Sequence, residues 1–250
     1  MHPYFGDAMI NVMLMLANWL QKNIKRQIPQ CCHLCGLSLD SPHALSLCSA
    51  CRLALQPTPR CQRCGLTTAI PTKQCGRCLK EPPWWQALYC IGDYRYPLTQ
   101  YIHQLKYQRQ FWLAKPLAQQ LSTVITEPAP VLCAVPMHWR RYLWRGFNQS
   151  DQLAKQLAQH LQVQYWPHLF HRQRATAPQK GLHRKQRRHN LYGAFGFTTP
   201  IYALGSHVAI IDDVVTTGST LKPLCQLLTK VGVTQIDVYC LCRTPEPSEP

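Results

Sequence analysis

The chain has 250 residues, which is enough for one large domain or for a medium domain with a small module. With 46% hydrophobic and 10% aromatic residues it can build a packed core, so global disorder is excluded. Lys and Arg number 27 against 11 Asp and Glu, and the net charge of +16 favours polyanionic partners such as nucleic acid or nucleotides. The 14 cysteines are too many for an ordinary cytosolic enzyme unless metal holds some of them.

The longest apolar run, residues 8–20, is interrupted by Asn11 and Asn18 and is shorter than the roughly 20 residues that a membrane span needs. It also lacks the positive start and the cleavage site of a secretory signal. Its apolar residues share one helical face, so we expect an amphipathic helix in residues 1–30 that packs on the body, with a membrane-surface helix as the alternative. Without an export signal, we expect a cytoplasmic protein with reduced thiols.

Four Cys-x-x-Cys pairs lie in residues 31–83. The pairs are Cys32 with Cys35, Cys48 with Cys51, Cys61 with Cys64, and Cys75 with Cys78. Each pair aims two thiolates at one point, and two pairs complete a tetrahedral zinc site. The spacing predicts a double zinc ribbon whose two Zn²⁺ sites are closed and structural. A disulfide framework or redox-active thiols is the alternative, and the missing export signal disfavours it.

Strands and helices alternate in residues 84–250, after a Pro-rich linker. We expect strands at residues 87–91, 131–135, 207–211 and 235–242, and helices at 101–107, 111–125, 147–161 and 219–231. Apolar strands joined by helices predict an α/β fold, a parallel sheet with helices on both faces. Ligands bind at the carboxyl ends of such strands, so the loops after Val135 and Ile211 are expected to carry the chemistry.

Two adjacent carboxylates, Asp212 and Asp213, follow the strand that ends at Ile211. Small and hydroxylated residues then open the next helix: Thr216, Thr217, Gly218, Ser219 and Thr220. Amides at a helix start and hydroxyl donors bind phosphate, whereas carboxylates suit hydroxyl groups or magnesium, so a ribose 5-phosphate fits both. An ordinary capped turn, the alternative, needs only one such residue. The segment resembles the signature of type I phosphoribosyltransferases, which bind phosphoribosyl pyrophosphate (PRPP).

Basic residues gather in two further segments. Arg140, Arg141 and Arg145 follow Val135 in what we expect to be a loop, and arginine forks match phosphate oxygens. In the resemblance the pyrophosphate lies here, so Arg140 and Arg145 are candidate ligands, with a solvated basic face as the alternative. Residues 172–190 hold seven Lys and Arg and no acid. We expect this second segment to be a loop, with three alternatives open: it closes over a ligand, it contacts a nucleic-acid backbone, or it is only solvated. It has no aromatic residue for base stacking.

The order of motifs along the chain is more specific than any one of them. The Cys pairs come first, then Leu105-Lys106-Tyr107, Val135-Pro136, Arg145-Gly146-Phe147-Asn148-Gln149 and Asp212-Asp213-x-x-Thr216-Thr217-Gly218. From about residue 32 to residue 243 the chain resembles the competence protein F (ComF/ComFC, GntX-like) family of bacteria. The resemblance implies a cytoplasmic protein of DNA uptake and natural transformation that handles incoming single-stranded DNA alongside competence machinery proteins. It also implies a phosphoribosyltransferase domain whose acceptor substrate is open.

Two functions remain open at this level. In the first, the chain is an enzyme that binds PRPP with Mg²⁺ and uses Asp212 and Asp213 as catalytic carboxylates. In the second, it is a non-catalytic module that senses PRPP or a nucleotide and binds DNA or protein. Release of pyrophosphate distinguishes them, because only the enzyme turns PRPP over.

Overall fold

The computed structural model describes residues 15, 31–32, 35–39, 47–172, 194–198 and 204–245. Except for Met15, the helix expected in residues 1–30 lies outside this description, and so does most of the basic segment 172–190. The chain forms two compact units, Met1–Ala54 and Leu55–Pro250. The division falls between the two pairs of Cys-x-x-Cys motifs, inside the module that we expected at residues 31–83.

The first unit is described around its four cysteines. A bridge joins Cys31 and Ser38 in antiparallel pairing. The short helix α2 (Ser49–Leu53) begins after Cys48, whose sulfur accepts a hydrogen bond from the Cys51 amide.

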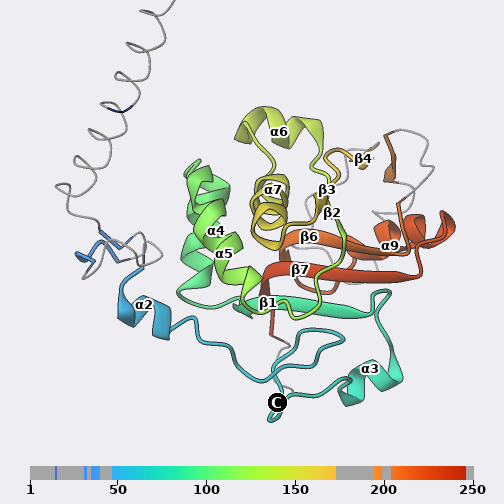
Figure 1. The fold of residues 1–250 in the computed structure, drawn as a ribbon, viewed down its shortest axis with the longest axis horizontal. Helices are drawn as coiled ribbons and strands as arrows, with labels where there is room; N and C mark the ends of the chain where they lie inside the picture. The colour runs from blue at the N-terminus through green and yellow to red at the C-terminus, as the bar shows by residue number, and fades with distance from the viewer. Residues whose placement is uncertain are drawn as a thin grey trace, which may run out of the picture. The chain divides into compact units, whose positions relative to one another are not determined.

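A parallel sheet forms the centre of the second unit (Figure 1). Its strands, in spatial order, are β1 (Ala87–Asp93), β7 (Gln235–Arg243), β6 (His207–Val215), β2 (Val131–Ala134) and β3 (Gln164–Tyr165). All four pairings are parallel. Both faces of β6 and β7 are covered, as their apolar sequences predict, because a strand with two buried faces has no solvated positions to fill with polar residues.

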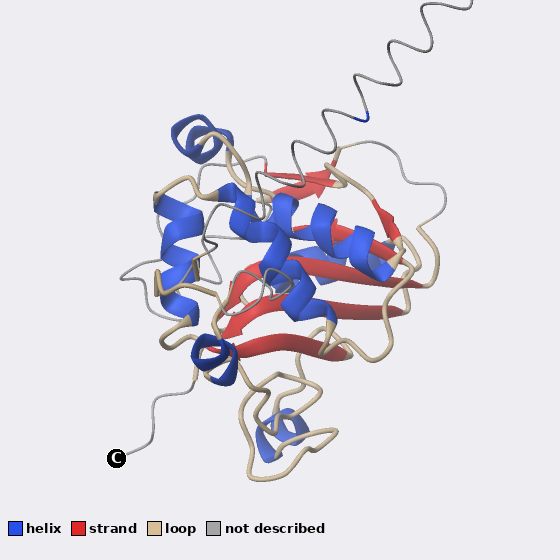
Figure 2. Cartoon of the chain, turned by 60° about the vertical axis from the view of Figure 1, so that its left-hand side comes forward, coloured by secondary structure: helices blue, strands red, loops and turns tan. Residues whose placement is uncertain are grey.

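Helices cover both faces of the sheet, as expected. On one face α5 (Ala114–Ser122) and α7 (Gln149–Leu161) pack on each other and on the strands. On the other, α9 (Leu221–Lys230) joins its leucines to Val208 and Ile210 in one apolar cluster. Figure 2 shows helices lying across the face of the sheet that is turned to the viewer.

The remaining described elements surround this core. They are α3 (Gly76–Lys80), α4 (Leu98–Tyr107), the 3₁₀ turn η1 (Phe111–Leu113), α6 (Trp139–Arg145), and an antiparallel pair made of β4 (Phe170–Arg172) and β5 (Phe195–Phe197). We did not expect β3, β4, β5 or α6 from the sequence. Among the helices that the structure describes, none has the length and apolar character needed to cross a bilayer.

The second Cys-x-x-Cys group belongs to the same unit as the sheet. The Leu88 amide at the start of β1 donates to the Gln62 carbonyl at 2.8 Å. Arg60 and Asp93 form an ion pair of 2.8 Å across the same boundary. The Trp85 indole donates to the Arg63 carbonyl at 2.8 Å. These contacts hold the cysteine-bearing segment against the sheet.

Candidate functional site

The two adjacent carboxylates lie within a strand, where we had expected a loop. β6 does not end at Ile211 but continues to Val215, because Asp212 pairs with Cys240 and Val214 with Cys242 on β7. The acidic pair is therefore held by the backbone ladder of the sheet. Its position is fixed before any ligand binds.

Each carboxylate has its own partners. Asp212 accepts from the Ser150 hydroxyl at 3.2 Å and from the Asp213 amide at 2.9 Å. Asp213 lies 2.9 Å from the Lys106 ammonium and accepts from the Gln149 amide at 2.7 Å. Lys106 comes from α4, and Gln149 and Ser150 come from the first turn of α7. Two helices, α4 and α7, thus converge on the acidic pair of β6.

The charges of this cluster are coupled. Burial, together with the charge of Asp213, raises the pKa of Asp212 to about 7. Burial works against a charged ammonium on Lys106, but the neighbouring Asp213 outweighs it, so the pKa of Lys106 is raised. Near neutral pH Asp212 is therefore poised between its charged and neutral forms, beside the ion pair of Asp213 with Lys106.

The turn predicted to bind phosphate follows the acidic pair. Gly218 adopts a φ of +72°, a left-handed conformation that favours glycine, and its carbonyl accepts from the Leu221 and Lys222 amides where α9 begins. A cavity of about 360 Å³ is lined by both carboxylates, Lys106, Thr216, Gly218, Ser219 and Thr220. Thr217 faces a neighbouring cavity of about 750 Å³, which Gly218 and Ser219 also line. The structure thus places the two carboxylates and most of the predicted phosphate loop around one space.

The basic segment after Val135 is a helix, which corrects our expectation of a loop. α6 begins where His138 Nδ1 accepts from the Arg140 amide, and it ends at Gly146, whose φ is +86°. Arg145 is buried, and its guanidinium donates to Gln149 Oε1 at 2.5 Å. Arg140 is exposed and lies over the ring of Trp139. Neither predicted ligand therefore faces the acidic pair directly.

Two other arginines line the space on that side. Arg141 and Arg172 face a cavity of about 220 Å³ that Asp212, Asp213 and Thr220 also line. Arg172 comes from β4, an element that the sequence did not predict. The cationic side of the site is therefore built by Arg141 and Arg172, and Arg145 reaches Asp213 only through Gln149.

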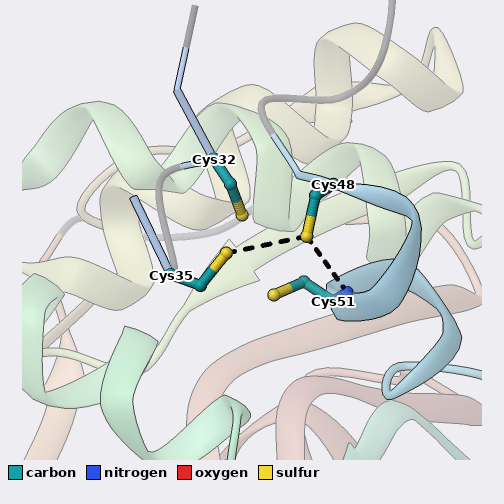
Figure 3. A group of neighbouring side chains, drawn as sticks. All are labelled: Cys32, Cys35, Cys48 and Cys51. Atoms are coloured by element: carbon teal, nitrogen blue, oxygen red, sulfur yellow. Dashed lines mark hydrogen bonds between the residues drawn. The ribbon is translucent and has the colours of Figure 1, made fainter. Parts of the chain in front are cut away.

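The eight predicted metal ligands form two groups of four. In the first unit, Cys32, Cys35, Cys48 and Cys51 bring their sulfurs within 4.8 Å of one another (Figure 3). In the second unit, Cys61, Cys64, Cys75 and Cys78 do the same. The sulfurs of a tetrahedral zinc site with Zn–S bonds of about 2.3 Å are about 3.8 Å apart. The Cys35–Cys48, Cys64–Cys75 and Cys61–Cys78 separations are 3.6, 3.7 and 3.9 Å. Both groups therefore fit a tetrahedral metal ion.

Each group contains the same kind of backbone turn. Gly36 and Gly65, which follow the first pair of each group, both have a φ of +74°. Backbone amides also point at sulfur, since the Cys51 amide donates to Cys48 and the Cys75 amide to Cys61. Cys31 is exposed and belongs to neither group. The other five cysteines are buried in the second unit, as expected.

Comparison with known proteins places the chain. It is 41% identical over 227 residues to the DNA utilization protein YhgH of Salmonella typhimurium strain LT2, covering 87% of this chain and 98% of that protein. It is 35% identical over 206 residues to competence protein F of Haemophilus influenzae, covering 79% and 90%. The chain belongs to the competence protein F (ComF) family. A family model described as a phosphoribosyl transferase domain matches residues 148–250 of this ComF-family chain, the part that carries α7, β6 and the phosphate loop.

A solved adenine phosphoribosyltransferase from Thermoanaerobacter pseudethanolicus also aligns with the ComF-family chain. The two are 14% identical, with a TM-score of 0.36, over 54% of this chain and 83% of the other.

In this ComF-family chain the second cysteine group contacts the phosphate loop through two side chains. The guanidinium of Arg243, at the end of β7, donates to the carbonyls of Cys64, Val215, Thr216 and Thr244. The Trp85 ring packs on Gly218 so closely that a Cβ at Gly218 would overlap it. The second cysteine group and the loop are thus parts of one packed assembly.

Lys106 and Gln149 were expected only as members of the family motifs, with no role of their own. Ser150 and Arg243 were given no role, and Arg172 was expected only as part of the basic segment 172–190. Each acts through a contact with a residue distant in the chain, which no local pattern reports. The one local signal was the position of Gln149 and Ser150 directly after the Arg-Gly-Phe-Asn segment.

Proposed function

We propose that this ComF-family protein binds PRPP together with Mg²⁺ at the end of β6 and takes part in the handling of incoming single-stranded DNA. The observation that supports PRPP binding is the shared cavity: the acidic pair and the loop of residues 216–220 line the same space. Carboxylates suit a ribose diol or a magnesium ion, and the loop suits the 5-phosphate. A ligand that has both a ribose diol and a 5-phosphate accounts for both the carboxylates and the loop.

The roles of the site residues follow from their chemistry. Asp212 and Asp213 bind the ribose hydroxyls or the magnesium ion. Thr216, Thr217, Gly218, Ser219 and Thr220 offer amides and hydroxyls to the 5-phosphate. On the pyrophosphate side, Arg141 and Arg172 take the place that we expected for Arg140 and Arg145. Arg145 supports Asp213 through Gln149.

A transferase reaction is the chemistry that this charge arrangement supports. Departure of pyrophosphate leaves positive charge on the ribose and negative charge on the leaving group. Carboxylates beside the ribose and arginines beside the pyrophosphate stabilise both if they are fixed in advance. The ladder pairing of Asp212 and the buried pairing of Asp213 supply that rigidity. We assign no acceptor substrate.

The assignment to DNA handling rests on relatives and on charge. Two relatives are named for DNA utilization and for competence. The net charge of +16 supports contacts with nucleic-acid phosphates, whose strength falls as salt rises. We assign one Zn²⁺ to each cysteine group in a structural role, because four thiolates leave no open position. Thiolate ligands favour a reducing compartment, which supports the cytoplasm as the location. The name of the Haemophilus influenzae relative supports competence machinery proteins as partners.

Calorimetric titration with PRPP and magnesium tests the site, with pyrophosphate release followed in parallel. Zinc-loaded wild-type protein is expected to bind, and the double variant Asp212→Asn with Asp213→Asn is expected to lose binding while staying folded. Glu127→Gln, which removes an exposed negative charge elsewhere in the second unit, is the matched control and keeps wild-type affinity. Unchanged affinity in the double variant refutes the site. Binding without release of pyrophosphate with any acceptor makes the protein a PRPP-sensing module.

A further inference from the structure

Helix α6 and the end of α4 expose an unusual set of aromatic side chains. Six aromatic residues in these neighbouring segments are each between 50% and 64% exposed: Tyr107, Phe111, Trp112, Trp139, Tyr142 and Trp144. With Arg109 and Arg140 they form what we call the aromatic–arginine surface. Figure 1 shows α6 standing at the edge of the sheet unit, beside α4 and α7. Exposed apolar groups that lie together in this way mark an interaction surface.

Contacts between side chains join several members of this surface to one another. The rings of Tyr107 and Trp144 meet edge to face with centroids 6.4 Å apart, and Arg109 donates to the Trp144 carbonyl at 3.4 Å. The rings of Phe111 and Trp112 are 5.5 Å apart, and the Arg140 guanidinium lies 5.3 Å from the ring of Trp139. The end of α4 therefore meets α6 at Trp144, and η1, which packs on α4, adds a further aromatic pair.

The composition of the surface distinguishes between classes of partner. Its apolar members are rings, with Leu143 as the exposed aliphatic neighbour. No Asp or Glu belongs to it, and its charges are arginines. Aromatic rings stack on bases and arginines bind phosphates, a combination typical of single-stranded nucleic-acid binding. Trp, Tyr and Arg also occur at protein and membrane interfaces, and the net charge of +16 favours the nucleic acid as the partner.

The surface also lies close to the acidic pair. Beneath it, the Arg145 guanidinium lies 5.5 Å from the ring of Tyr107 and donates to Gln149, which in turn donates to Asp213. A nucleic-acid strand stacked on α6 would therefore be separated from the site that we assign to PRPP by two side chains, Arg145 and Gln149. The basic segment 172–190 carries no aromatic residue, so this surface supplies the stacking that the segment lacks.

We propose that the aromatic–arginine surface is where this protein binds single-stranded nucleic acid, by stacking bases on Trp139, Tyr142 and Trp144. The inference rests on the proposed role in DNA handling and adds the surface and the mode of recognition. Recognition by stacking is tolerant of sequence, because every base has an aromatic face. Duplex DNA, whose bases are already stacked on each other, is a poorer ligand.

Fluorescence anisotropy with a labelled oligo-dT of about 20 nucleotides, longer than a typical single-strand site, tests the proposal. Replacing Trp139, Tyr142 and Trp144 together by Ala is expected to weaken binding at least ~100-fold, since each of the three lost stacks counts for about five-fold or more. The same three positions changed to Phe are expected to stay within about three-fold of wild type, because rings remain to stack. Trp84→Ala, which removes an exposed tryptophan that lies 5.0 Å from the Lys222 ammonium and outside the surface, is the matched control with wild-type affinity.

The arginines give a separate readout. Arg109→Gln with Arg140→Gln is expected to reduce the slope of log affinity against log salt by about 1.4, because two phosphate contacts are lost. The aromatic variants are expected to leave that slope unchanged. A stacking surface and a merely charged surface are thereby told apart.

The outcomes separate this inference from the proposed function. If the wild-type protein binds oligo-dT and the triple Ala variant binds equally well, the surface assignment is wrong while DNA handling stands. If the wild type does not bind oligo-dT at all, the proposed DNA handling itself fails. If the triple Ala variant instead loses binding to phosphatidylglycerol vesicles and not to oligo-dT, the surface is a membrane contact and the inference is overturned. PRPP titration of the same variants reports on the PRPP site independently.

Discussion

The guanidinium of Arg243 donates to the carbonyl of Cys64 at 2.9 Å and, from its other side, to the carbonyls of Val215 and Thr216. One buried side chain thus joins a cysteine-bearing turn to Thr216, the first residue of the loop 216–220 that we propose for the 5-phosphate. Its burial lowers the pKa of Arg243 from its ordinary value, but the side chain keeps its donors on carbonyl oxygens. Integrity of the second cysteine group and shape of the loop are therefore linked.

Removal of this side chain tests the link. Arg243→Ala leaves four carbonyl acceptors without their donor, and we expect it to lower the free energy of unfolding by about 3 kcal/mol and to weaken PRPP binding. Arg95→Ala, an exposed arginine of the same unit, is the control and is expected to change stability by less than about 0.5 kcal/mol. Urea unfolding and PRPP titration of both variants provide the measurements. Equal stability and equal affinity in the two variants would contradict the link.

A pair of metal-site variants tests the same link from the other side. Cys48→Ser and Cys64→Ser each disable one cysteine group, so each is expected to lose one of the two bound zinc ions. Only Cys64→Ser is expected to speed hydrogen exchange at the amides of residues 216–220, because Cys64 contacts Arg243 and Cys48 lies in the other compact unit. Metal content and exchange rates are measured on the same samples. Faster exchange in Cys48→Ser would show that the loop does not depend on the second group alone.

Gly218 is predicted to tolerate no side chain. Gly218→Ala places a methyl group in the ring of Trp85 at a φ of +72°. Gly232→Ala has a φ of +91° and nothing within 4 Å, so it carries the backbone strain alone and costs about 1 kcal/mol. We expect Gly218→Ala to cost about 2 kcal/mol more than this control and to weaken PRPP binding, as measured by urea unfolding and titration. A matching loss in both variants would mean that Trp85 moves aside freely.

The raised pKa of Asp212 predicts a pH-dependent stability. The ordinary pKa of an aspartate is about 3.9, and in the folded protein that of Asp212 is about 7. Between these values the unfolded chain has already released the proton that the folded chain still holds, so stability falls as pH rises from about 4 to 7 and then levels off. Asp212→Asn removes this dependence. We expect the variant to gain roughly 2 kcal/mol relative to wild type between pH 5 and pH 8, measured by urea unfolding. A difference that stays constant across this range would mean that Asp212 titrates normally.

Local patterns predicted the parts of this protein whose function is encoded by neighbouring residues. The Cys-x-x-Cys pairs and the apolar run into Asp212 and Asp213 are such patterns, because the turn or the strand that positions them lies in the same few residues. The grouping of the eight cysteines into two sets of four and the parallel sheet followed from them.

Features that depend on distant pairing were not predictable in this way. β6 continues past Ile211 only because Val214 and Val215 find partners on β7, which follows after a helix. Lys106 and Asp213 are 107 positions apart in the sequence and meet through the packing of α4 against the sheet. α6 was taken for a loop because its aromatic and basic residues show no apolar face toward a core. The side chains of α6 are largely exposed, so the sequence of this helix lacks the apolar periodicity that indicates a packed helix.

The two acids of β6 lower the stability of the strand that carries them. A buried central strand is most stable when every side chain is apolar. This one carries two adjacent acids before its last two residues, and Lys106, Gln149 and Ser150 pair with them. Selection for a sturdier fold alone would replace those acids with valine or isoleucine. Relatives that keep the sheet but have lost the ligand should therefore show an apolar pair at these two positions. They should also unfold at a higher temperature than this protein does.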